Sequence, residues 1–378
     1  MYLKVVVAVD SFKGSLGSLE IGQCIKDSIL EINPLIDVVV KGVADGGEGT
    51  IDALANAYQG EIFHVEVNNA YMEKIDCRYL LCEDKKMAVI EVAEIVGLAK
   101  CQRREPRYAS SYGIGEVIQV CLDKGVREFI IGLGGSATND AGIGMLQALG
   151  LKVDFKDVYD LLNIRKIDIS ALDPRLQECQ FTLASDVTNP LCGKLGATAI
   201  FGRQKGVKED EVALLDNALN NFANMVQCVL GKDLKNAKGA GAAGGLGYAF
   251  LTFMSANMQS GAKLVMEAQH LEEEIKTADL VITGEGCIDE QTSMGKIPMI
   301  IAQIAKKYDV LAIGIGGSIQ QAASSLHTKG MIAYFSIQCE PHTLQKAMQK
   351  EVTKAQLRST TQEIIRLILF YCKPRHIR

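Results

Sequence analysis

The chain has 378 residues, of which 48% are hydrophobic and 22% carry a charge, so it can bury a sizeable core and is not a disordered chain. Its formal net charge is -5, and the sequence lacks the basic domain with clustered Lys and Arg that nucleic-acid binding requires. No apolar stretch approaches the ~18 residues of a membrane helix. The eleven cysteines are scattered without CxxC pairs, which indicates reduced thiols. We therefore expect a cytoplasmic protein without membrane or nucleic-acid partners.

The N-terminal part alternates between strands and helices. A continuous apolar run predicts a strand over 3–9, and apolar residues at helical spacing predict a one-faced helix over 18–32 with Ser18 as its N-cap. A second strand is expected at 38–40 and a second helix at 50–58. This alternation is typical of an α/β protein with a largely parallel sheet.

The pattern changes after the second helix. Three closely spaced strand candidates, 61–67, 75–81 and 87–92, have no helices between them and predict a mixed sheet. A further strand is expected at 129–131, before a glycine-rich loop and a helix. The segment 186–261 consists mostly of predicted helices and glycine loops.

The alternation returns in the last third of the chain. A strand at 280–283 is predicted to lead into a loop at 284–292 and then a helix. Two more strands, at 310–313 and 331–335, are each followed by a helix, and the final helix covers roughly 351–371. The sequence therefore predicts two α/β domains. Both chain ends, 1–64 and 285–378, form a Rossmann- or flavodoxin-like domain, and 65–284 forms an inserted mixed α/β domain. The active site is expected in the cleft between them.

Glycine-rich loops that leave strand ends bind ligands in α/β proteins, because glycine lets backbone N–H groups approach a phosphate. The loop DSFKGS offers Lys13 as a cation for phosphate or carboxylate oxygens, and a surface lysine in a turn is the alternative. The loop ADGGEGT carries Asp45 and Glu48 among three glycines, which suits Mg²⁺ or a substrate hydroxyl. Its alternative is a tight turn with a solvated acidic cap.

Two further loops are richer in glycine. GLGGSATND, at 132–140, matches GxGxxA after a strand, so a dinucleotide fingerprint is one interpretation. KGAGAAGGLG, at 238–247, contains GxGxxG but follows no predicted strand. It fits an anion-binding helix start, with a closely packed glycine–alanine helix pair as the alternative.

The last two loops carry acidic and basic side chains at predicted strand ends. ASDVTNP contains Asp186, and TGEGCIDEQTSMGK supplies Glu285, Asp289, Thr292 and Lys296. No Walker A sequence, serine nucleophile elbow or HExxH occurs, and no histidine lies in a glycine loop. Phosphoryl transfer needs cations, amide cradles and a carboxylate that orients the attacking hydroxyl, and these loops supply all three.

Taken in order, these motifs resemble the bacterial glycerate kinase family along nearly the whole chain. The matching strings are DSFKGS, ADGGEGT, GGSATND, SDVTNPLCG, FGRQKG, GAGAAGGLG and ITGEG-x-x-D-x-QT-x-x-GK-x-P. The resemblance implies ATP- and Mg²⁺-dependent phosphorylation of a hydroxyl of D-glycerate to give phosphoglycerate. It does not indicate which hydroxyl is phosphorylated, or the oligomeric state.

The resemblance also implies roles for individual residues. By this resemblance, Asp45, Asp186 and Asp289 are candidates for the base that receives the hydroxyl proton. Asp45 and Asp186 are also candidates for Mg²⁺ ligands. We favour Asp186 as the base because Thr188–Asn189 and Pro190 make its loop rigid. The expected catalytic residues are Asp186, Lys13, Asp45 and Asp289. The expected substrate- and phosphate-binding residues are Gly134, Gly135, Ser136, Thr138, Asn139, Gly241, Gly244, Gly245, Glu285, Thr292 and Lys296.

The chain departs from the family pattern at several positions. Ile114 and Cys287 stand where the family has threonine and arginine, Ala141 replaces a glycine, and the segment 155–169 is shortened. A kinase of a related hydroxy acid, or a weak paralogue that acts as a nucleotide or sugar-acid sensor, is therefore an alternative. The retained charged residues argue against a sensor. A dehydrogenase is supported only by loose glycine patterns.

Overall fold

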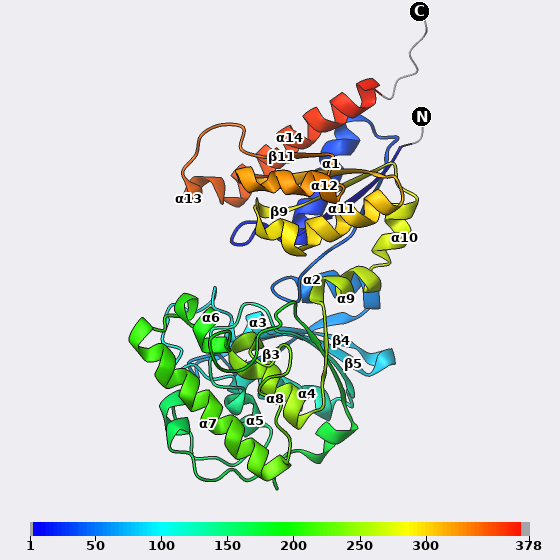
Figure 1. Cartoon of the computed structure of the whole chain (residues 1–378). Coiled ribbons are helices and arrows are strands. Elements are labelled where there is room, and N and C mark those ends of the chain that lie inside the picture. Colours follow the sequence, from blue (N-terminus) through cyan, green and yellow to red (C-terminus); the bar gives the residue numbers. More distant parts are fainter. Residues whose placement is uncertain (1–2, 372–378) are drawn as a thin grey trace, which may run out of the picture. The chain divides into compact units, whose positions relative to one another are not determined.

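A computed structural model describes residues 3–371 (Figure 1). The chain divides into two compact units, each with its own sheet. Unit 1 lies within Met1–Ala44, Asp52–Leu54 and Val265–Arg378, and unit 2 consists of Asp45–Ile51 and Ala55–Leu264. The predicted domain boundaries, and an active site between the domains, remain predictions.

Unit 1 contains a five-stranded parallel sheet built from both ends of the chain, as predicted. Its strand order is β11-β10-β9-β1-β2. These strands are β1 (Lys4–Val9), β2 (Asp37–Val40), β9 (Leu280–Ile288), β10 (Leu311–Ile319) and β11 (Ala333–Ser336). Val5 to Val9 of β1 are almost completely buried, as expected for a parallel strand that is covered on both faces.

The helices of unit 1 bury the apolar faces that their spacing predicts. Helix α1 (Ser18–Ile32) buries Ile21, Ile25 and Ile29 completely and packs beside α14 (Lys350–Tyr371) (Figure 1). The other helices here are α10 (Leu271–Lys276), α11 (Ile297–Lys307), α12 (Leu326–Lys329) and α13 (Leu344–Ala347). Two helices, α2 (Thr50–Tyr58) and α9 (Gly261–Ala268), contribute residues to both units.

Unit 2 contains the mixed sheet that the sequence predicts. Its order is β3-β4-β5-β6-β7-β8, in which the first three strands pair antiparallel and the last four pair parallel. The strands are β3 (Glu61–Asn68), β4 (Lys74–Cys82), β5 (Met87–Glu91), β6 (Glu128–Gly132), β7 (Gln180–Ala184) and β8 (Asn257–Gln259). The sequence therefore changes from antiparallel to parallel pairing at β5.

The helices of unit 2 pack around this sheet. They are α3 (Val92–Val96), α4 (Tyr112–Asp123), α5 (Ile143–Ala148), α6 (Ala197–Lys205), α7 (Val212–Leu230) and α8 (Leu246–Phe253). Stacked rings of Phe129 and Phe181, 4.7 Å apart, and the tilted ring of Phe250 join β6, β7 and α8 in one core. Short 3₁₀ turns of this unit cover Glu83–Lys85, Val158–Leu162, Pro174–Glu178, Glu209–Glu211 and Ala242–Gly245, and those of unit 1 cover Gln291–Met294 and Gln321–Ser325.

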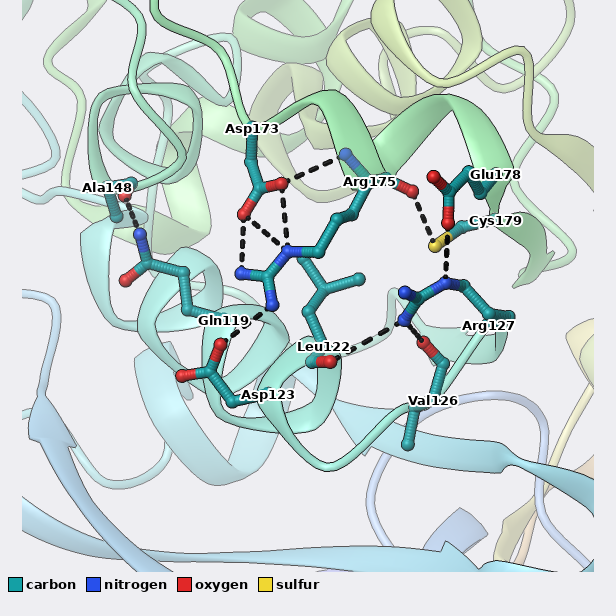
Figure 2. Close-up of polar contacts among 10 residues, drawn as sticks. All are labelled: Gln119, Leu122, Asp123, Val126, Arg127, Ala148, Asp173, Arg175, Glu178 and Cys179. Atoms are coloured by element: carbon teal, nitrogen blue, oxygen red, sulfur yellow. Dashed lines mark hydrogen bonds and ion pairs between the residues drawn. The ribbon is translucent and has the colours of Figure 1, made fainter.

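A charged network ties the amino ends of β6 and β7 to α4. Figure 2 shows Arg175 between two carboxylates, with Asp173 accepting from Nε and Nη2 and Asp123 accepting from Nη1 at 2.8 Å. In the same network, Arg127 donates from Nε to Glu178 at 3.0 Å. Ligands of α/β sheets bind at the opposite, carboxyl edge, so this network stabilises the fold.

The predicted N-cap role of Ser18 is wrong. Helix α1 takes Gly17 as its N-cap, and Ser18 is already helical. The Ser18 hydroxyl donates to the carbonyl oxygen of Val9 at 2.7 Å and accepts from the N–H of Val43 at 3.0 Å. Ser18 therefore joins the end of β1 to the segment that follows β2, a link between distant residues that a local capping pattern cannot reveal.

The predicted loop at 284–292 is wrong in its first half. Strand β9 continues to Ile288 because it stays paired with β10, in a register that reaches Ser318↔Cys287 and Ile319↔Ile288. The glycines in GEGCI and GIGGSI favoured a loop in the sequence. Pairing between the two strands outweighs this local preference, so Glu285 lies in a strand.

Candidate active site

Two predicted carboxylates, Asp45 and Asp186, lie together in unit 2. Both have exposed side chains, and Asp186 follows the carboxyl end of β7. Atoms packed around the Asp186 carboxyl desolvate it and raise its pKa, and the negative charge of Asp45 raises it further. Hydrogen bonds from the Ser260 hydroxyl and the Ala262 backbone oppose this increase. The sequence places these two aspartates 141 positions apart, and the fold makes them electrostatic neighbours.

Close backbone packing holds the Asp45 loop. Gly46 has a φ of +89°, and a Cβ there would come within 2.3 Å of the Ala184 carbonyl oxygen. A Cβ on Gly261 would come within 2.1 Å of the Asp45 carbonyl oxygen. Glycine is therefore required at both positions. The buried Glu91 carboxylate, which sequence reasoning missed, accepts from the N–H groups of Gly49 and Ile51 and so fixes the start of α2.

The GLGGSATND loop contains the predicted ligand-binding residues Ser136, Thr138 and Asn139. All three side chains are buried at the carboxyl end of β6. Among the described residues, Thr138 Oγ1 and Asn139 Oδ1 have no hydrogen-bond partner. A buried polar atom without a partner costs about 1–3 kcal/mol, so these two atoms are candidates for contact with a ligand. Gly134 and Gly135 precede them, and a Cβ on Gly134 would come within 2.6 Å of Gly47 Cα.

A buried lysine contacts this loop, and sequence reasoning assigned it no role. Lys205 ends α6, is only 3% exposed, and donates from Nζ to Ser136 Oγ at 2.9 Å and to the Thr138 carbonyl oxygen at 2.7 Å. Burial lowers the pKa of Lys205 to about 7, although the negative charge of Asp140 acts in the opposite direction. Its only sequence signal is its place in FGRQKG, because an isolated lysine is usually exposed.

The second glycine-rich motif packs against the same loop. A Cβ on Gly244 would come within 1.9 Å of the Thr138 carbonyl oxygen, and one on Gly241 within 2.2 Å of the Pro190 carbonyl oxygen. Gly245 has a φ of +94° and contacts Ala141. Close backbone packing is therefore sufficient to explain these glycines. The phosphate-binding role of Gly241, Gly244 and Gly245 remains a prediction.

The predicted charged cluster of unit 1 is formed by Glu285, Asp289, Thr292 and Lys296. The Thr292 hydroxyl donates to Glu285 Oε1 at 2.7 Å and accepts from the Asp289 N–H at 2.9 Å. Lys296 Nζ lies 3.0 Å from Glu285 Oε2 and 3.9 Å from Asp289 Oδ1. Burial alone would lower the pKa of Lys296, but the Glu285 carboxylate and then Asp289 raise it. Lys296 is therefore a firmly charged cation.

Lys13 lies at the same edge of the unit 1 sheet as this cluster. Strand β1 pairs with β9 up to Val9↔Gly284, and the Asp10 N–H donates to the Gly284 carbonyl oxygen at 2.9 Å. The backbone of Lys13 passes close to Gly286, where a Cβ would lie 3.8 Å from the Lys13 nitrogen. The DSFKGS loop is therefore a neighbour of the TGEG segment in the carboxyl half of β9, at the edge of the sheet where ligands of α/β proteins bind.

The departures from the family pattern lie in different surroundings. Ile114 is completely buried in the hydrophobic core of unit 2. Cys287 is half-buried, and the amide nitrogen of Gln320 lies 3.8 Å from the Cys287 Sγ. Ala141 has a φ of +52°, a left-handed conformation that glycine adopts more readily. The shortened segment 155–169 contains the 3₁₀ turn Val158–Leu162.

The acidic residues fit Mg²⁺ only as a pair. Within residues 3–371 no group of three or more His, Cys, Asp or Glu side chains could hold a metal ion by itself. Mg²⁺ commonly binds through one or two carboxylates, with substrate phosphates and water completing the shell, and Asp45 with Asp186 meets that need.

The ten described cysteines form no disulfide. None of the helices between residues 3 and 371 has the length and apolar character needed to span a bilayer.

The fold and these loops define an α/β protein equipped for phosphoryl transfer. Residues 5–369 match the model of the glycerate kinase family. The chain is 41% identical over 377 residues to the glycerate kinase of Haemophilus influenzae, covering 97% of this chain and 99% of that one. It is 43% identical over 356 residues to the glycerate 2-kinase of Escherichia coli, covering 92% and 93%. The chain belongs to the glycerate kinase family, which implies that it uses ATP.

A solved structure shows the same fold. It is the crystal structure of a proposed glycerate kinase 2 from Salmonella typhimurium LT2, with a TM-score of 0.84 and 40% identity. The match covers 99% of this chain and 100% of that one. These findings confirm the family that the order of the motifs indicated.

Proposed function

We propose that the protein transfers the γ-phosphoryl group of ATP to the 2-hydroxyl of D-glycerate, with Asp186 as the base. Phosphorylation of glycerate follows from the family. The name of the Escherichia coli relative, a glycerate 2-kinase, supports the choice of hydroxyl. Gly261 packs against the Asp45 backbone, and its neighbours Ser260 and Ala262 hydrogen-bond Asp186, so the loops ADGGEGT and SDVTNP lie close together; this is the observation that carries the proposal.

Asp186 and Asp45 have different roles in the proposed reaction. Asp186 accepts the proton of the attacking hydroxyl as the hydroxyl oxygen bonds to the γ-phosphorus and the bond from that phosphorus to the ADP oxygen breaks. Asp45 would hold Mg²⁺, which neutralises charge on the phosphate oxygens when it is bound. Phosphoryl transfer uses a carboxylate that orients the attacking hydroxyl and a metal ion that neutralises phosphate charge, and Asp186 and Asp45 can supply the carboxylates for these two roles.

The GLGGSATND loop and two lysines, Lys13 and Lys296, bind and orient the substrates. Thr138 Oγ1 and Asn139 Oδ1 can satisfy their missing hydrogen bonds with a phosphate or with the hydroxyls of glycerate. Lys13 and Lys296 neutralise phosphate or carboxylate charge. Glu285 and Asp289 hold the Lys296 ammonium in place through the 3.0 Å and 3.9 Å contacts. Phosphoryl transfer depends mainly on such positioning and charge stabilisation.

Product identification tests the proposal. The protein is incubated with Mg-ATP and D-glycerate, L-glycerate, tartronate or no acceptor, and ADP release and the phosphorus NMR spectrum are recorded. We expect turnover of about 1–100 s⁻¹ with D-glycerate and a product that enolase consumes directly. A product that needs a mutase before enolase would contradict the 2-hydroxyl but not the kinase. ATP binding without turnover on any acceptor would favour the altered-substrate or sensor alternative.

A further inference from the structure

Helix α6 directly follows the loop that carries Asp186. Hydrogen bonds within the intervening segment include one from the Ala197 N–H to the Leu191 carbonyl oxygen at 2.9 Å and one from the Asn189 amide to the Leu195 carbonyl oxygen at 2.8 Å. The position of α6 is therefore coupled to that of the Asp186 loop through a short, hydrogen-bonded connection.

The same helix holds the GLGGSATND loop at two points. Near its start, Thr198 Oγ1 accepts from the Asn139 amide at 3.0 Å, and both side chains are almost completely buried. At its end, Lys205 Nζ bonds Ser136 and Thr138. Thr198 and Lys205 are seven residues apart, about two turns of an α-helix, so they share one face. That face is turned toward the loop at both ends of the helix.

Lys205 is poorly explained as a packing residue. A buried charge is expensive, and an apolar residue of similar volume usually stabilises such a site better. Its Nζ donates to two uncharged oxygens, Ser136 Oγ and the Thr138 carbonyl oxygen, and the negative charge of Asp140 favours the ammonium form. Because the side chain is only 3% exposed, it has little surface for a ligand. Its hydrogen bonds are directed at the loop backbone and hydroxyl.

We propose that α6 is a positioning element of the active site, in which Lys205 and Thr198 fix the loop Gly134–Asn139 in its ligand-binding conformation and keep it aligned with the Asp186 loop. The ligand-binding role of the loop rests on the function proposed above. Lys205 and Thr198 act through Ser136, Thr138 and Asn139 and do not themselves contact substrate. The FGRQKG motif, which contains Lys205, therefore has a positioning role that differs from the proposed charge-neutralising role of the charged cluster in unit 1.

Three variants and one control test this proposal. Thr198→Val removes the hydroxyl at nearly constant volume, and Thr198→Ser keeps it. Lys205→Met removes the amine, and Lys208→Met changes an exposed lysine three positions further on. Amide hydrogen exchange of the free protein and steady-state kinetics for ATP and for D-glycerate are measured for each.

We expect Thr198→Val and Lys205→Met to speed exchange in the segment 133–140 while β9, in the other unit, is unaffected. We expect kcat/KM to fall roughly tenfold to a hundredfold, because misplacement of a binding group by about an ångström has effects of that size. Thr198→Ser and Lys208→Met should match the wild type. If Lys205→Met does not fold, the comparison of Thr198→Val with Thr198→Ser is sufficient to test the proposal.

Two results would overturn the proposal. One is unchanged exchange and kinetics in both Thr198→Val and Lys205→Met. The other is a uniform rise of exchange over all of unit 2, with Thr198→Ser as impaired as Thr198→Val, since that indicates a packing defect. Failure of the proposed function is seen separately, because the wild type would then make no phosphoglycerate, while hydrogen exchange would still report on the loop.

Discussion

Ser111 and Asp140 are joined twice, because the backbone N–H and the hydroxyl of Ser111 both donate to Asp140 Oδ2, at 2.8 Å and 2.7 Å. The same completely buried carboxyl accepts from the N–H groups of Gly142 and Gly144. Burial raises the pKa of Asp140 above its ordinary value, although these four hydrogen bonds oppose the increase. Asp140 therefore organises the chain between the predicted ligand loop and α5, including the left-handed Ala141.

Replacing this carboxyl should destabilise unit 2. Asp140→Ala leaves the donors of Ser111, Gly142 and Gly144 without partners inside the protein. Each orphaned buried donor costs about 1–3 kcal/mol, so we expect the free energy of unfolding to drop by about 3 kcal/mol or more. Urea unfolding measures the change, with the exposed Asp210→Ala as the control. A drop no larger than that of the control would contradict this role.

Asp186 should be essential for turnover but not for nucleotide binding. The variant Asp186→Asn keeps the size of the side chain and removes its ability to accept a proton, so kcat should fall by roughly a hundredfold or more. Binding of ATP, measured by calorimetry, should persist. The control is Asp154→Asn, at an exposed aspartate of the same unit. Near-normal turnover of Asp186→Asn would transfer the role of base to Asp45 or Asp289.

Lys296 should contribute a charged contact to the reaction. Lys296→Met removes the cation that Glu285 and Asp289 hold, and a charged hydrogen bond contributes about 1.5–3 kcal/mol. We therefore expect kcat/KM to fall roughly tenfold to a hundredfold. The exposed Lys329→Met is the matched control. Equal kcat/KM values in the two variants would exclude Lys296 from the site.

Lys205 should make stability depend on pH. Its pKa is about 7 in the folded protein and 10.5 ordinarily, so between these values the unfolded chain binds more protons. The free energy of unfolding should then rise with pH in this window, by up to about 1.4 kcal/mol per pH unit. Urea titrations of wild type and Lys205→Met at several pH values isolate this contribution, since other groups, Asp140 included, are common to both. Parallel curves for the two proteins would contradict it.

Local patterns predicted most of the fold. The 3.6-residue spacing of Ile21, Ile25 and Ile29 was sufficient for α1, and the strand candidates without intervening helices correctly indicated the mixed sheet. The glycine motif ADGGEGT also located the loop that carries Asp45, and the strand-end motif ASDVTNP located the loop that carries Asp186. These features depend on residues that are close in sequence, and such signals survive without knowledge of the tertiary structure.

What the sequence could not predict depends on contacts between distant segments. The burial of Lys205 arises because α6 packs on a loop nearly seventy residues earlier, and Glu91 accepts from the N–H of Ile51, which lies forty residues before it at the start of α2. The strand character of Glu285 comes from pairing with β10. In each case the residue type alone indicated a surface or loop position, and tertiary packing decided otherwise.

The order of the strands in unit 1 has a consequence for how the chain is made. β1 pairs with β9, which begins 271 positions after Val9, and every strand of unit 2 lies between them in the sequence. During synthesis at about 5–20 residues per second, β1, α1 and β2 leave the ribosome long before β9. β2 can pair with one edge of β1 early, whereas the edge that β9 covers stays unpaired for many seconds. The newly made N-terminal segment therefore carries an open strand edge, of the kind that can pair with other chains, until β9 is made.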